Sequence, residues 1–101
     1  MFVAVAKGSS AVAYSSDGIN WTASNLPTSA DWISVTYGDN KFVAVAYNGE
    51  IAAYSNDGIE WQQANLPSSA NWISVVYGCG GFVTIANNSN IVAFSPDGIV
   101  W

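Results

Sequence analysis

Residues 42–81 read FVAVAYNGEIAAYSNDGIEWQQANLPSSANWISVVYGCGG, and this stretch decides the fold because the chain repeats it. Residues 2–41 match it at more than half of their positions when the chain is shifted by 40 residues. Residues 82–101 match its first half. A period near 40 residues, built from short strand-like runs, is typical of propeller blades.

Each repeat contains four strand-like segments separated by turn residues. In the complete copy they are Trp32–Tyr37, Phe42–Tyr47, Ile51–Ser55 and Ile59–Gln63. Val, Ile, Ala and aromatic residues fill the segments, and an Asp-Gly pair recurs between them, which is a strong hairpin signal. The connections that contain Pro27 and Pro67 are expected to be loops, where a missing N–H costs little.

The apolar pattern favours stacked sheets. The segment FVAVA is apolar at every position, so both faces of that strand are expected to be covered, as they are between neighbouring blades. We therefore predict an all-β chain of four-stranded antiparallel meanders arranged as β-propeller blades. A parallel β-solenoid is the alternative, although its repeats are usually shorter and its turns less hairpin-like.

The domain organisation follows from the repeat. Residues 1–101 are expected to form one array, with a partial blade of three strands (2–31), a complete blade (32–71) and a last blade that ends at its fourth strand (72–101). Three blades cannot close a ring, which typically needs 4–8. We expect a homo-oligomer closed by association of several chains, most simply a dimer with six blades. Rearranged end blades that give five, and a fragment excised from a longer propeller, are the alternatives.

Composition excludes two classes of partner. The chain has two Lys, no Arg, no His and a formal net charge of −5. Nucleic-acid binding requires cationic side chains that neutralise phosphates, so it is not expected. An anionic membrane surface is an equally poor partner.

A motif of the form S-x-D-G-I-x-W occurs in all three copies. It resembles the Asp-box of bacterial neuraminidases and other sialidase-like propellers, with one residue fewer between Asp and Gly and without the Thr before Trp. The resemblance implies a folding role, in which the Asp accepts bonds from turn N–H groups and the Trp packs against the blade. The residues with this expected structural role are Ser15, Asp17, Gly18, Trp21, Ser55, Asp57, Gly58, Trp61, Ser95, Asp97, Gly98 and Trp101.

Catalysis is not expected. The sialidase resemblance implies an arginine triad, a Tyr nucleophile and an Asp acid/base, and this chain has no Arg. The absence of His removes Ser-His and Cys-His pairs. Glu50 with Asp31 or Asp39 could form the carboxylate pair used in glycoside hydrolysis. Ordinary solvation of surface carboxylates explains these residues better. No metal site or cofactor is expected, and Cys79 is expected to be a free, exposed thiol.

One loop face differs between copies, and differing loops are where binding is expected. The segments KGSS, YNGE and NNSN occupy the same repeat position but share no pattern. Amide and carboxylate groups beside aromatic rings suit sugar hydroxyls. The candidate ligand-binding residues are Tyr47, Asn48, Glu50, Asn87, Asn88 and Asn90, with Trp32 and Trp72 as stacking platforms.

The expected function is therefore a non-enzymatic binding module, lectin-like or protein-binding, assembled from several chains. Two alternatives stay open. One is an engineered or excised propeller fragment with a purely structural, self-assembling role. The other is a piece of a sialidase-like glycosidase that lacks the catalytic residues.

Overall fold

The computed structural model describes residues 1–101 and consists of nine strands joined by turns, which confirms the all-β prediction. The strands are β1 (Phe2–Val5), β2 (Lys7–Ser15), β3 (Thr22–Gly38), β4 (Lys41–Tyr47), β5 (Gly49–Ser55), β6 (Gln62–Ala70), β7 (Trp72–Gly78), β8 (Gly81–Ala86) and β9 (Val92–Ser95). They form two antiparallel sheets, ordered β1-β2-β3-β4-β5-β6 and β7-β8-β9. The chain contains no helix that could cross a membrane.

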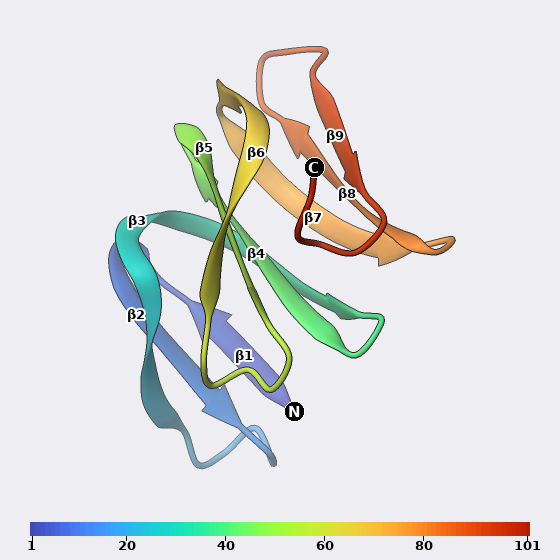
Figure 1. Cartoon of the computed structure of the whole chain (residues 1–101). Helices are drawn as coiled ribbons and strands as arrows, with labels where there is room; N and C mark the ends of the chain where they lie inside the picture. Colours follow the sequence, from blue (N-terminus) through green and yellow to red (C-terminus); the bar gives the residue numbers. More distant parts are fainter.

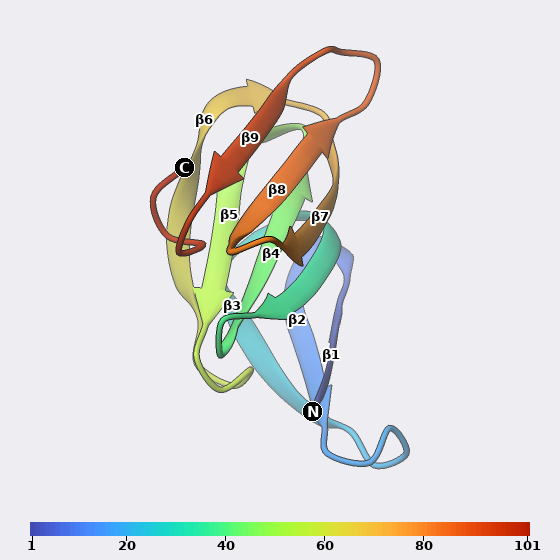
Figure 2. The same cartoon turned by 90° about the vertical axis from the view of Figure 1, so that its right-hand side faces the viewer.

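The long strand β3 bends, so that its two halves belong to different parts of the fold (Figure 1). Residues 22–31 pair with β2, and residues 31–38 pair with β4. We call β1, β2 and the first half of β3 the first layer. The second half of β3 with β4, β5 and β6 is the second layer, and β7, β8 and β9 are the third layer. The three layers lie one behind another, with the third nearest the viewer in Figure 2.

Two apolar cores hold the layers together. Between the first and second layers, Val12 and Leu26 pack with Phe42, Ala44 and other buried residues. Between the second and third layers, the buried residues are Val43, Val45, Ala52, Ala64, Leu66, Trp72, Val75, Phe82, Ala86 and Ala93. The second layer is thus covered on both faces, as the unbroken apolar pattern of its FVAVA segment predicts.

Two-residue turns connect the first two strands of the second and third layers. In the β3–β4 turn, Asp39 and Asn40 have φ angles of 51° and 57°, and in the β7–β8 turn, Cys79 and Gly80 have 52° and 81°. Positive φ at both central residues is the signature of a type I′ turn, whose twist matches the twist of the strands. Asn, Asp and Gly tolerate this region best, whereas Cys79 is an exposed exception.

The structure corrects the predicted fourth segment of the repeat. The stretch Ile59–Gln63 was expected to be a strand and the following connection a loop, but β6 begins at Gln62 and runs through Pro67 to Ala70. The ladder between β5 and β6 pairs Ile51 with Asn65 and next pairs Gly49 with Ala70. Pro67 lies in the interval without paired residues, where its missing N–H breaks no ladder bond.

The strand β3 runs through residues 31 and 32 without a break, because Asp31 is paired both with Lys7 of β2 and with Tyr47 of β4. At the corresponding position between the second and third layers, Asn71 separates β6 from β7. The same repeat position is therefore continuous strand in one copy and a strand end in the next.

Phe82 offers a direct test of the core between the second and third layers. Its side chain is fully buried there. We expect Phe82→Ala to lower the free energy of unfolding by about 3–5 kcal/mol, the usual cost of truncating a buried Phe. Urea denaturation followed by far-UV circular dichroism measures it. Ser16→Ala, at an exposed turn position, is the control and should change it by less than about 0.5 kcal/mol. A loss below about 1 kcal/mol for Phe82→Ala would contradict this packing.

Candidate functional site

The Ser-x-Asp-Gly turns are closed hydrogen-bonded units. In the second copy, the Ser55 hydroxyl donates to Asp57 Oδ1 at 3.0 Å and accepts from the Gly58 N–H at 2.8 Å. The N–H groups of Ile59 and Glu60 donate to the same carboxylate oxygen at 2.9 and 3.0 Å. The bonds recur in the other two copies, around Asp17 and Asp97.

These bonds favour the ionised carboxylates. The N–H groups of Ile59 and Glu60 lower the pKa of Asp57. The corresponding N–H groups lower the pKa values of the other two, from Asn20 and Ile19 for Asp17 and from Ile99 and Val100 for Asp97. An acceptor already engaged by its own turn, with a lowered pKa, is a poor general acid. The three carboxylates therefore stabilise the turns.

The Trp of the motif differs between the three copies in its burial and in its hydrogen bonding. Trp61 is buried and donates its indole N–H to the Gly58 carbonyl at 3.2 Å. Trp101 is partly buried, and its Nε1 has no hydrogen-bond partner. Trp21 is 46% exposed, although burial was expected. The reason is that Trp61 packs into the core shared with the first layer, whereas the corresponding face of the first layer is uncovered.

The two tryptophans predicted to be stacking platforms do not have that role. Trp32 and Trp72 are 1% and 0% exposed, and a ring covered on both faces cannot stack on a ligand. Each donates its indole N–H to a carbonyl four residues earlier, Thr28 at 3.1 Å and Ser68 at 3.3 Å. These bonds fix the connection that precedes each inner strand.

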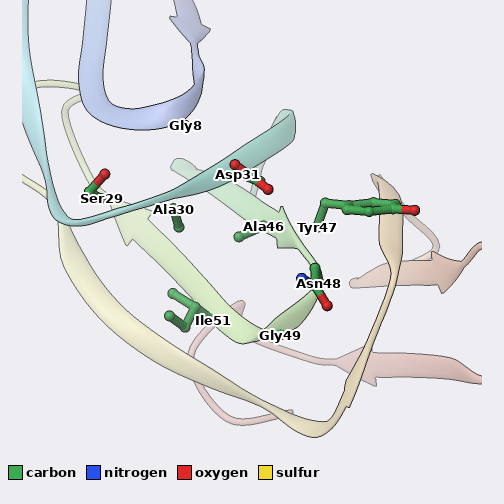
Figure 3. Close-up of a pocket in the computed structure, with 9 residues that line it drawn as sticks. All are labelled: Gly8, Ser29, Ala30, Asp31, Ala46, Tyr47, Asn48, Gly49 and Ile51. Atoms are coloured by element: carbon green, nitrogen blue, oxygen red, sulfur yellow. The ribbon is translucent and has the colours of Figure 1, made fainter.

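A hollow lies at the end of the first and second layers where the variable loops gather (Figure 3). Its volume is about 380 Å³, within the range of small-molecule sites. The residues that line it are Gly8, Ser29, Ala30, Asp31, Ala46, Tyr47, Asn48, Gly49 and Ile51. We call it the first hollow. The ring of Tyr47 extends away from Ala30 and Ile51 in Figure 3, and the Lys7 ammonium lies 5.5 Å from its centre.

A second hollow of about 370 Å³ occupies the same position between the second and third layers. Its lining residues are Asn48, Ser69, Ala70, Asn71, Asn87, Asn88, Ser89 and Ile91. Each lies 40 residues after a residue that lines the first hollow. Asn48 lines both hollows. In the first hollow it has the position that Asn88 has in the second, and in the second hollow it has the position that Gly8 has in the first. The two hollows are therefore one repeated site.

The structure brings together four of the six predicted loop residues. Tyr47 and Asn48 line the first hollow, and Asn48, Asn87 and Asn88 line the second. The exposed residues Glu50 and Asn90 lie outside both linings.

The candidate ligand-binding residues did not include the polar residue that precedes each buried inner-strand Trp, although Asp31 was considered as a carboxylate partner of Glu50. Asp31 and Asn71 are both half-buried and line the first and second hollows, respectively. The available signal was their position directly before Trp32 and Trp72, where a hydrophilic residue follows a connection that ends on the variable face.

The hollows offer hydrogen-bonding groups and small apolar surfaces. The first has the Asp31 carboxylate, the Asn48 amide and the Ser29 hydroxyl. The second has four Asn amides and two Ser hydroxyls. Neither lining includes a cation, and no cluster of three or more His, Cys, Asp or Glu residues in the chain could hold a metal ion. Such a surface suits a neutral ligand rich in hydroxyl groups.

No family model matches this chain, and no match was found among curated proteins. The geometry of the two hollows is therefore the observation from which a function can be argued.

The Ser-x-Asp-Gly turns predict a specific acid sensitivity. Because the folded pKa of Asp57 lies below its unfolded value, the carboxylate contributes stability above that unfolded value, near 4. That contribution is lost as the pH falls through the folded pKa. We expect Asp57→Asn to be less stable than the parent at pH 7, with the difference shrinking at pH 2–3. Urea denaturation at several pH values measures it.

The control for this experiment is Asn56→Ser. Asn56 lies in the same exposed turn, and its side chain makes no hydrogen bond there. Its pH profile should match that of the parent protein. A constant stability difference between parent and Asp57→Asn from pH 7 to pH 2 would contradict the role given to the ionised carboxylate.

Proposed function

We propose that this chain is an array of β-propeller blades, closed into a ring with other copies, that binds neutral carbohydrate at a site repeated between successive blades. The observation that carries the proposal is the correspondence of the two hollows, residue by residue, across the 40-residue repeat. A cavity formed by chance irregularity has no reason to recur at the same repeat positions, even where the residues differ, as Asp31 and Asn71 do. A repeated binding site does.

The arrangement of the strands supports the blade interpretation. The second layer is a four-stranded antiparallel meander, and its neighbours pack against both of its faces. Successive meanders packed face to face are the architecture of a propeller. The resemblance of the Ser-x-Asp-Gly-Ile-x-Trp turns to the Asp-box points to the same architecture, because all three turns are closed in the same way.

The chemistry of the linings supports a sugar rather than a charged ligand. An Asn amide offers a donor and an acceptor side by side, which matches neighbouring hydroxyl groups. The Asp31 carboxylate accepts hydrogen bonds from hydroxyls and repels anions. Ala30 and Ile51 in the first hollow, with Ala70 and Ile91 in the second, supply apolar contact for the C–H groups of a sugar ring.

The proposed role is binding without catalysis. The hydrogen-bonded carboxylates of the Ser-x-Asp-Gly turns line neither hollow. Asp31 is the one carboxylate in the first hollow, and the second contains none. Glycoside hydrolysis ordinarily uses a pair of carboxylates that flank the scissile bond.

Asn48 allows both hollows to be weakened by one substitution. Its φ angle is 60°, so Asn48→Gly removes the amide and keeps a residue that tolerates this backbone. A glycan array identifies the sugar, and isothermal titration calorimetry compares the variants. We expect Asn48→Gly to weaken binding by about tenfold or more per site, the cost of losing roughly 1.4 kcal/mol of hydrogen bonding.

The matched control is Asn40→Gly. Asn40 has a φ of 57° but lies in the β3–β4 turn, outside both linings. This variant should bind as the parent does. No signal on any glycan, or equal binding by Asn48→Gly and the parent, would exclude carbohydrate recognition at the hollows and favour a protein ligand.

A further inference from the structure

The outer face of the third layer is an uncovered copy of a face that is buried elsewhere in the chain. Ile85 and Val92 are 47% and 60% exposed, whereas their repeat equivalents Val45 and Ala52 are fully buried against the third layer. Ile85 and Val92 are cross-strand partners, so their side chains share one face of the sheet. A second row on that face is Val76, Val83 and Phe94. We call these five residues the trailing face.

The opposite end of the stack carries a second uncovered face. Phe2 is 56% exposed, while its equivalents Phe42 and Phe82 are buried. Ala4 is exposed, while its equivalent Ala44 is fully buried in the core between the first two layers. We call Phe2, Ala4, Ala13 and Trp21 the leading face. The two faces lie on the outermost layers of the stack, the leading face on the first layer and the trailing face on the third (Figure 1).

Inside the chain, the face of one layer that corresponds to the trailing face packs on the face of the next layer that corresponds to the leading face. This happens at two interfaces, with the same close contact at each. At the first interface, a Cβ built on Gly58 would lie 3.1 Å from Val3 Cγ2 and 3.2 Å from Phe42 Cε2. At the second, a Cβ on Gly98 would lie 2.6 Å from Val43 Cγ2 and 3.2 Å from Phe82 Cε2.

The turn glycine therefore sits between the Phe of its own layer and the Val of the preceding layer. A Cβ built on Gly18 would lie 3.5 Å from the Phe2 ring, but no Val of a preceding layer lies near it. The residue that would complete the set is Val83, which lies on the trailing face.

We propose that the trailing face of one copy packs on the leading face of a second copy, with Val83 placed against Gly18 of that copy. The occupant is a copy of this chain because the two faces reproduce, position by position, the two sides of the interfaces already present between its layers. The contact is head-to-tail, and two copies that make it reciprocally close into a ring of six layers, within the usual range for propellers. The inference rests on the proposed blade arrangement, but it does not require the hollows to bind sugar.

The experiment uses one charged substitution on each face. Val92→Asp disables the trailing face, and Ala4→Asp disables the leading face. Light scattering should give the parent protein twice the 10.6 kDa mass of one chain. Each variant alone should give the mass of one chain, because every head-to-tail contact needs both faces. The control is Gln63→Asp, at an exposed position on the second layer, and this variant should keep the parent mass.

Mixing the two variants is the decisive step. Ala4→Asp keeps an intact trailing face and Val92→Asp keeps an intact leading face, so an equimolar mixture should regain the mass of two chains through one contact. That open pair should dissociate at a higher protein concentration than the parent, whose two contacts close a ring and raise the effective concentration. Circular dichroism verifies that each variant is folded. If Val92→Asp fails to fold, Ile85→Lys replaces it; if Ala4→Asp fails to fold, Ala6→Lys replaces it, at an exposed position two residues after Ala4.

Three results would overturn the inference. The first is a parent protein with the mass of one chain. The second is a two-chain mass for Ala4→Asp alone, which would indicate contact between two trailing faces. The third is a mixture of folded variants that does not pair. Because both hollows form within one chain, sugar binding by monomeric Val92→Asp tests the proposed function separately.

Discussion

The rest of the structure depends on how closely the layers approach one another at the turn glycines. Gly58 and Gly98 carry no side chain, so a Phe from the same layer and a Val from the preceding layer can fill the space above each backbone. Both have φ near 80°, a region in which a side chain would add strain. The Ser55 hydroxyl accepts a hydrogen bond from the Gly58 N–H itself, and the Asp57 carboxylate accepts one from the next N–H, that of Ile59, so the glycine is held in place. One short motif therefore shapes the turn and sets the spacing between sheets.

The fold could be predicted from the sequence where the repeat and local chemistry agree. Unbroken apolar runs such as Phe42–Ala46 predicted strands covered on both faces, and these residues are buried between layers. The prediction failed at Ile59–Gln63, because the turn bonds around Asp57 occupy Ile59 and Glu60 and delay the start of β6. It failed again at Pro27 and Pro67, because the expected loops lie inside β3 and β6. An outer strand can include a proline where the ladder is interrupted, and single-sequence patterns do not show ladders.

The candidate site was partly predictable for a different reason. Divergence between copies pointed to the loops that contain Asn48 and Asn87, and both residues line hollows. The prediction that Trp32 and Trp72 are stacking platforms was wrong, because the sequence alone does not distinguish a Trp that packs in a core from one that contacts a ligand. Trp32 and Trp72 are enclosed by neighbouring layers, a property of the three-dimensional stack. Asp31 and Asn71 were not predicted to bind a ligand, because a single polar residue directly before a Trp carries no pattern that separates a site residue from a strand end.

Asn48 belongs to the walls of both hollows, and this shared position links them. The Asn48 amide has a single orientation at a time. A ligand that fixes this orientation in the first hollow therefore also fixes which amide atoms face the second hollow. The two hollows are therefore not independent at this position, and a substitution of Asn48 alters the walls of both at once. The other lining residues, such as Asp31 and Asn71, each belong to one hollow, so a change there leaves the neighbouring wall as it was.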